Sequence, residues 1–179
     1  CKVLDVAQEL GASVTLVLWG SPISARSINP EIGYIGRHFL ADPDGTSWVT
    51  LCADETEFAE NFVTFVDWLI NEKGYTCVRE ITPYNEPDGN ISPLDRYYKV
   101  CEALDARLRR EGLREQVKLN LSDNTDCRRW WLRGCAANLE EEADLFNSHT
   151  YIFGYDDPNR KALNWQRRNV RVAQRAGKK

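Results

Sequence analysis

Apolar residues follow two periods along this chain, and segments with the two periods alternate. Four short segments are continuously apolar or apolar at every second position, which predicts strands. The longer segments between them repeat apolar residues every three to four positions, as amphipathic helices do. The predicted strands are Val14–Trp19, Cys77–Pro83, Val117–Leu121 and Phe146–Phe153. The first is apolar almost throughout, a pattern typical of a strand covered on both faces.

Helix signals stand before, between and after these strands. The predicted helices cover Lys2–Leu10, 54–74, 92–112, Cys127–Ala143 and Asn159–Ala176. In the second, Asp54 and Glu57 have capping-box spacing and Gly74 is a typical stop. Its expected buried face consists of Phe58, Phe62, Phe65, Val66 and Leu69. The third opens with Ser92-Pro93, and its expected buried stripe consists of Leu94, Tyr97, Tyr98, Cys101, Leu104 and Leu108.

The order, one helix followed by four strand–helix units, requires parallel strands, because each crossover has the length of a helix. Two architectures fit: an open doubly wound sheet, or part of a (β/α) barrel. The length of 179 residues favours the open sheet, since a full barrel needs about 250. However, no glycine-rich phosphate loop follows any strand, and polar side chains gather just past the strand ends, where barrel active sites lie. We therefore predict an α/β fold that is a partial (β/α)8 TIM barrel of four parallel units with a leading helix.

Composition and charge narrow the function classes only slightly. No apolar run reaches the roughly 18 residues that would span a bilayer. The net charge of −4 is unevenly distributed: eight basic and no acidic residues follow position 159, which leaves 15 basic against 27 acidic residues before it. A solvated helix face explains this basic segment better than a nucleic-acid contact, because aromatic residues do not interleave it beyond Trp165. The six cysteines form no CxxC pair, so we expect no structural metal site.

Candidate chemistry concentrates at the end of the second predicted strand. Glu86 stands there between Asn85 and Pro87. A carboxylic acid beside an amide suits the cleavage of a glycosidic bond, because the acid protonates the leaving oxygen while the amide grips a sugar hydroxyl. The following proline is expected to restrict Glu86 to extended backbone angles and so to help aim its side chain.

With these residues the sequence resembles glycoside hydrolase clan A, the retaining (β/α)8 β-glycosidases that include cellulases, mannanases, xylanases and glucosylceramidase-like enzymes. The segment 81–89, Ile-Thr-Pro-Tyr-Asn-Glu-Pro-Asp-Gly, looks like the end of barrel strand four, and residues 147–151, Asn-Ser-His-Thr-Tyr, look like strand six. The other two predicted strands then correspond to strands three and five. The resemblance spans nearly the whole chain, although only Asn85-Glu86-Pro87 and the pair His149 and Tyr151 are specific.

The resemblance implies a role for each matching residue. Glu86 would be the general acid/base, and Asn85 would bind the 2-hydroxyl of the sugar being cleaved. His149 and Tyr151 would hold substrate or orient a second carboxylate, and Trp19 would offer an aromatic floor for a sugar ring. The partner would be a carbohydrate, neither nucleic acid nor a membrane span is expected, and the chemistry needs no cofactor. Family habit implies an extracellular or periplasmic protein.

The sequence departs from the clan at the nucleophile, a glutamate at the end of strand seven that we expect beyond Lys179. Barrel strands one, two, seven and eight are absent, so we interpret residues 1–179 as one segment of a larger glycosidase whose missing half is a possible partner. Asp123, Asp156 and Asp157 lie on the same rim, and we favour turn or helix-cap roles for them. The alternative function is a non-catalytic carbohydrate-binding or inactive barrel relative. A nucleic-acid-associated domain is a third hypothesis.

Overall fold

The computed structural model describes residues 1–18, 54–88, 94–125, 128–150 and 158–178. The predicted alternation of helices and strands is confirmed. The elements are α1 (Lys2–Glu9), β1 (Val14–Val17), α4 (Glu55–Asp67), the π-helix η1 (Trp68–Glu72), β2 (Val78–Thr82), α5 (Leu94–Arg110), β3 (Lys118–Asn124), α6 (Arg129–Asn138), β4 (Leu145–Ser148) and α7 (Pro158–Arg175).

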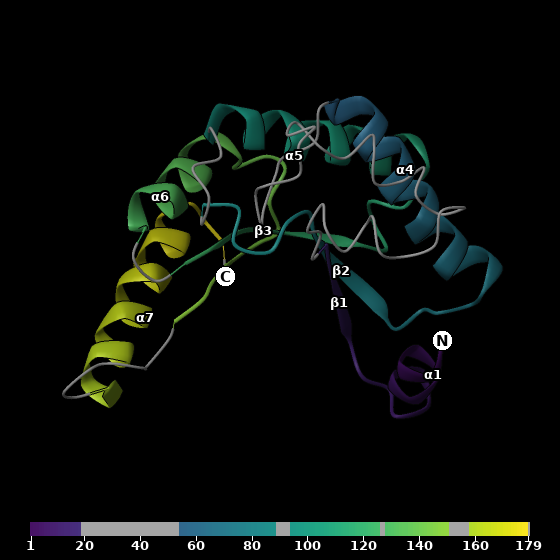
Figure 1. Ribbon diagram of the computed structural model, residues 1–179, viewed down its shortest axis with the longest axis horizontal. Helices are drawn as coiled ribbons and strands as arrows, with labels where there is room; N and C mark the ends of the chain where they lie inside the picture. The colour runs from purple at the N-terminus through teal and green to yellow at the C-terminus, as the bar shows by residue number, and fades with distance from the viewer. Residues whose placement is uncertain (19–53, 89–93, 126–127, 151–157, 179) are drawn as a thin grey trace, which may run out of the picture.

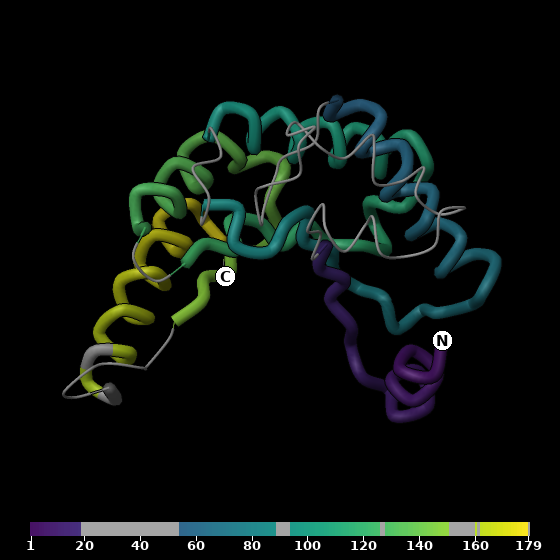
Figure 2. Tube along the Cα trace, viewed as in Figure 1, coloured from purple at the N-terminus to yellow at the C-terminus, as the bar shows by residue number. Residues whose placement is uncertain are grey.

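The four strands form one parallel sheet in the order β1-β2-β3-β4, so spatial neighbours are also sequence neighbours. A constant direction of winding places the intervening helices on one face of the sheet. Figure 1 shows the result: α4, α5, α6 and α7 follow one another over the convex side of an arched sheet. The trace in Figure 2 shows α1 and α7 at the two feet of this arch. The fold is an α/β arrangement of parallel strand–helix repeats.

Local signals explain where the helices begin and end. The Asp54 carboxylate accepts a hydrogen bond of 2.8 Å from the Glu57 backbone N–H, as the capping pattern predicts. At the far end, Gly74 adopts a left-handed φ of 72°, but the final turn before it is a π-helix that the sequence pattern did not indicate. The α6 prediction was too long, because the helix ends at Asn138 and the chain turns toward β4 after the buried Leu139.

The core lies between the sheet and the helices that cover it. Sheet residues such as Ile81, Leu119 and Leu121 are fully buried against Tyr97, Leu104 and their neighbours on α5. Most members of the expected stripes are buried, Leu94 and Tyr98 on α5 are partly buried, and Phe65 on α4 is exposed. Phe65 is 50% exposed and stacks on Trp68, because the buried arc of α4 is centred on the far side of Phe62 and leaves Phe65 at its edge.

The opposite face of the sheet is polar and partly open among the described residues. The Glu80 carboxylate there accepts hydrogen bonds from Thr15 Oγ1 at 2.9 Å and from Asn120 Nδ2 at 3.2 Å. Thr15 and Val17 are exposed, so the prediction that the first strand is covered on both faces was wrong for the described structure. Leu16 and Leu18 lie partly buried against the core on the helix-bearing side.

Candidate functional site

Glu86 lies just past the carboxyl end of β2, where the chain turns away from the sheet. The backbone N–H of Asn85 donates to the carbonyl of Leu18 at 3.1 Å and extends the pairing with β1 by one step. Glu86 itself has a φ of 47°, in the left-handed region. The expected extended conformation before Pro87 was therefore wrong, because a tertiary contact to the Glu86 backbone, described below, overrides the local preference. Its side chain is 22% exposed.

The structure brings Glu86 into contact with His149, which follows β4. The His149 backbone N–H donates to the Asn124 carbonyl at 2.8 Å, which continues the pairing of β3 with β4. From this position the imidazole Nδ1 lies 2.7 Å from Glu86 Oε1. Two residues 63 positions apart in sequence thus meet because parallel strands end at the same edge of the sheet.

Asp123 is the third member of the cluster, and sequence analysis assigned it wrongly. We favoured a turn or helix-cap role, but the residue is 1% exposed, and its carboxylate contacts both other members. Oδ1 lies 3.1 Å from His149 Nε2, and Oδ2 accepts a hydrogen bond of 3.2 Å from the Glu86 backbone N–H. The position of Asp123 at the end of the third predicted strand correctly indicated the carboxyl edge of the sheet. Nothing in the local sequence pattern, however, distinguishes a buried carboxylate from a turn residue.

The backbone at this end of the sheet is strained. Within the described segments, the non-glycine residues with positive φ are Glu86 at 47°, Ser122 at 78° and Asp123 at 47°. Left-handed conformations cost a side chain-bearing residue of order 1 kcal/mol, and they concentrate at functional sites. Their coincidence with the Glu86–His149–Asp123 cluster is the strongest structural sign that this edge of the sheet has a function.

Two buried aromatic residues hold the strained segment in place. The Ser122 N–H donates to the Tyr97 hydroxyl of α5 at 3.0 Å, and the Ser122 carbonyl accepts from Trp131 Nε1 of α6 at 3.2 Å. Tyr97 and Trp131 are fully buried, and their ring centroids lie 5.1 Å apart. The helix core therefore fixes the backbone that carries Asp123.

The charge of the cluster depends on His149. Its hydrogen bond and electrostatic attraction to Asp123, together with the contact to Glu86, raise the pKa of the imidazole to about 9, although partial burial opposes the shift. At neutral pH the ring therefore carries a proton on each nitrogen and donates from both. The cluster at that pH is an imidazolium held between two carboxyl groups.

Asp88 forms a second buried contact beside the cluster. Its carboxylate accepts hydrogen bonds of 2.9 Å from both the backbone N–H and the Oγ1 of Thr125, and Arg128 donates to its backbone carbonyl. Burial raises the pKa of Asp88, while the Thr125 hydrogen bonds oppose the rise. This contact ties the segment after β2 to the segment after β3, and it supports the positions of both Glu86 and Asp123.

The other predicted site residues are placed less fully. Asn85 is half-buried beside Glu86, at the same edge of the sheet. Trp19, Tyr151, Asp156 and Asp157 lie outside the described residues.

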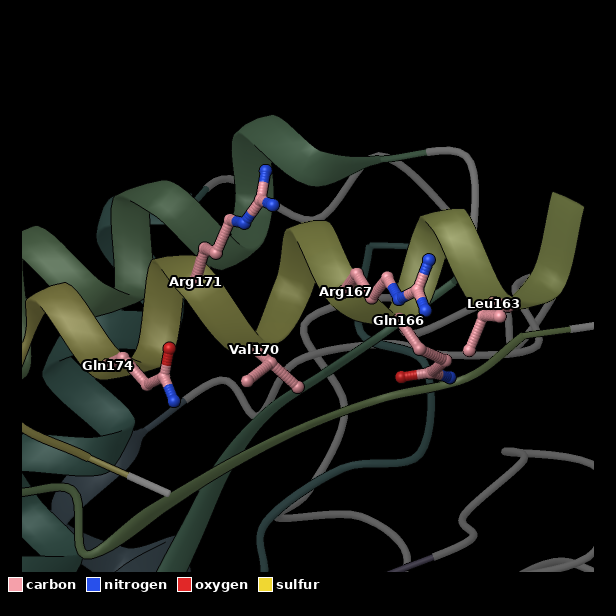
Figure 3. A pocket seen from close by; sticks show the side chains of 6 residues that line it. All are labelled: Leu163, Gln166, Arg167, Val170, Arg171 and Gln174. Atoms are coloured by element: carbon pink, nitrogen blue, oxygen red, sulfur yellow. The ribbon is translucent and has the colours of Figure 1, made fainter. Parts of the chain in front are cut away.

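A surface hollow of about 450 Å³ lies apart from this cluster, along the flank of α7. Figure 3 shows Leu163, Val170 and two arginines, Arg167 and Arg171, projecting from this one helix. Leu163 and Val170 are about half exposed. Since a single helix supplies its lining and no member of the cluster contributes, the hollow is not part of the candidate site.

Comparisons with protein-family models, with curated proteins and with solved structures find no match for this chain. None of the helices in the described ranges combines the length and hydrophobicity that a bilayer crossing requires. In the same ranges, no group of three or more histidine, cysteine, aspartate or glutamate side chains is arranged to hold a metal ion.

Proposed function

We propose that this chain supplies part of a (β/α)8 barrel in a retaining β-glycosidase, with Glu86 as the general acid/base. The observation that carries the proposal is the contact of 2.7 Å between Glu86 Oε1 and His149 Nδ1 at the carboxyl ends of the parallel strands. Active sites of (β/α) barrels lie at this end of the sheet. The resemblance of the two segments to the catalytic strands of clan A points to the same pair.

The strand order supports a barrel over a doubly wound sheet. In a doubly wound sheet the order reverses at a switch point, and helices cover both faces. Here the order is sequential across all four strands, and the helices α4, α5, α6 and α7 share one face (Figure 1). Continuing the same curvature with further strand–helix units would enclose the polar face that carries Glu80, as a barrel interior requires.

The proposed reaction has two proton transfers at Glu86. In the first step the Glu86 carboxyl gives its proton to the glycosidic oxygen as the bond to the sugar breaks, while a second carboxylate attacks the sugar. By the resemblance, that nucleophile follows the next strand, beyond Lys179. In the second step the Glu86 carboxylate takes a proton from the water that releases the sugar. We propose that the enzyme is exported. It would contact its carbohydrate through Asn85, Tyr151 and Trp19.

Glu86→Gln in the complete enzyme tests this assignment. A glutamine keeps the size of the side chain but carries no transferable acid proton, so turnover of unactivated β-glycosides should fall at least about a hundredfold. Aryl glycosides with a strongly acidic phenol as leaving group need little protonation, so their cleavage should fall much less in the first step. Hydrolysis of both substrate types, measured over a panel of sugars, separates these outcomes.

Glu60→Gln is the matched control. Glu60 is an exposed residue of α4 that pairs with Arg107 of α5 at 3.2 Å, and the same substitution there should leave turnover unchanged. Wild-type turnover in Glu86→Gln would remove Glu86 from the mechanism. Binding of oligosaccharides without hydrolysis by the complete wild-type protein would favour the non-catalytic alternative.

A further inference from the structure

Asp123 connects the two groups of the candidate site through two different oxygens. Oδ1 is 3.1 Å from His149 Nε2, whereas Oδ2 receives the Glu86 backbone N–H at 3.2 Å. One side chain therefore contacts both the imidazole ring and the backbone that carries the proposed acid. Its near-complete burial leaves it no direct access to a substrate in the described structure.

The position of Asp123 is set from the core. The Ser122 N–H donates to the Tyr97 hydroxyl, and Trp131 Nε1 donates to the Ser122 carbonyl; the two hydrogen bonds hold this preceding residue at a φ of 78°. Asp123 follows in the same left-handed region and turns its carboxylate toward β4. A strained backbone that several buried contacts hold in place is expected where a side chain must keep one orientation.

We propose that Asp123 is a positioning residue for Glu86: it fixes the orientation of the His149 ring through Nε2, so that Nδ1 is held against Glu86 Oε1. The chemical role rests on the proposed function, whereas the positioning itself is a property of the folded chain. When one N–H of an imidazole donates to a fixed carboxylate, the ring is held in one orientation. Its other nitrogen then points in a defined direction. The same logic orients histidines in hydrolase triads on unrelated folds.

The charged groups described in contact with His149 come from two neighbouring strands: Glu86 after β2 and Asp123 in β3. On the other side, α7 approaches β4 with neutral side chains, since Asn169 donates to Ser148 Oγ at 2.8 Å and Gln166 donates to Thr150 Oγ1 at 2.6 Å. Replacing Asp123 by asparagine therefore removes one of the two described carboxylates in contact with the ring. The asparagine side chain has nearly the same size as the aspartate that it replaces.

The test is a nuclear magnetic resonance titration of His149 in the full chain, which requires no substrate. In the wild type both ring nitrogens should stay protonated up to about pH 9. In Asp123→Asn the midpoint should fall by at least about one pH unit, and the Glu86 amide proton should shift because it loses its carboxylate acceptor. Asp67→Asn, an isosteric change at the end of α4, where the carboxylate accepts a hydrogen bond from Asn71, should leave both signals unchanged. An unchanged His149 midpoint in Asp123→Asn overturns the proposal.

Activity gives a second readout that separates this proposal from the first. With the complete enzyme, Asp123→Asn should lower kcat at least about tenfold with little change in KM, and the alkaline limb of the pH profile should move to lower pH. Full activity in Asp123→Asn, combined with loss of activity in Glu86→Gln, would overturn the positioning role and keep the acid/base role. A shifted His149 midpoint in a protein that hydrolyses no glycoside would keep the positioning of the ring and overturn the proposed function.

Tyr97→Phe keeps the test decisive if Asp123→Asn fails to fold. The substitution removes the hydroxyl that accepts from the Ser122 N–H but retains the buried ring. It should lower the His149 midpoint by a few tenths of a pH unit, because the segment that carries Asp123 loses one of its two anchors. A midpoint identical to that of the wild type would contradict the proposed chain of contacts.

Discussion

The two ends of the sheet hold similar charges in different ways. At the amino-terminal end, Arg114 bridges Asp105 and Asp144, with nitrogen–oxygen distances of 2.6 and 2.7 Å. At the carboxyl end, His149 bridges Glu86 and Asp123. In each cluster one side chain contacts two carboxylates. Arginine keeps its charge at any pH at which the protein is folded, whereas histidine exchanges its proton within the range in which enzymes work.

The backbone conformation also differs between the two ends of the sheet, in the residue types that adopt a left-handed φ. The left-handed residues before β1, β2 and β3 are Gly11, Gly74 and Gly112, which adopt such angles without strain. After β2 and at the end of β3, the left-handed residues are Glu86, Ser122 and Asp123, which do not. The contrast indicates that the amino-terminal end of the sheet is built for stability, while the carboxyl end accepts strain to hold particular side chains.

The largest expected effect on stability is at the amino-terminal end. Arg114 also donates to the Glu142 carbonyl at 2.8 Å, and Asp144 accepts from the Leu119 N–H at 2.8 Å, so the cation connects α5, β3 and the turn before β4. Arg114→Met should lower the free energy of unfolding by about 3 kcal/mol, because two carboxylates lose their shared cation. Chemical denaturation measures this loss. A change below about 1 kcal/mol would show that the cluster contributes no more than a surface ion pair.

An intermediate effect is expected from pH, and among the described residues it arises at the carboxyl end of the sheet. The pKa of His149 in the folded chain is about 9, above its ordinary value of 6.5, so the bound proton stabilises the fold fully below pH 6.5. That contribution is lost as the pH rises through 9. The free energy of unfolding should therefore fall by about 2 kcal/mol between pH 6.5 and 9, less than the full shift implies because the ring is partly exposed.

His149→Gln isolates this contribution. The variant should lose most of the pH dependence in that interval, whereas Arg114→Met should retain it, since arginine does not titrate there. Denaturation curves at pH 6.5, 7.5 and 9 compare the three proteins. An identical pH dependence in His149→Gln and in the wild type would show that other groups carry it.

The smallest effect concerns the strained backbone. Ser122→Gly relieves a φ of 78° and should raise the free energy of unfolding by about 0.5 kcal/mol, a gain reduced by the lost hydrogen bond from Ser122 Oγ to Asn124. Gly112→Ala, at a φ of 69° before β3, should lower it by about 1 kcal/mol. Thermal unfolding of the two variants gives the comparison. Stabilisation in both would contradict the assignment of strain to one end of the sheet.

Local signals were sufficient for most of the fold. The Asp54 cap, the glycine at position 74 and the buried stripe of α5 follow from capping chemistry and helical period, which act within a few residues of one another. Phe65 and the length of α6 were predicted wrongly. The edge of a buried arc and the end of a helix depend on what packs against them.

The candidate site likewise contains features that follow from local sequence and features that depend on tertiary packing. By itself the sequence placed Glu86 just past the second predicted strand and His149 within the fourth, Phe146–Phe153, and the resemblance put both at the edge where parallel strands end. The structure ends β4 at Ser148, so that His149 also lies just past its strand. Only the tertiary structure decided that Asp123 is buried between them and that Glu86 is left-handed rather than extended. A hydrogen bond from the Glu86 backbone to a carboxylate 37 residues away outweighs the local preference before Pro87. Contacts of that range leave no periodic or capping pattern in the sequence, because they depend on how the helices pack the strands together.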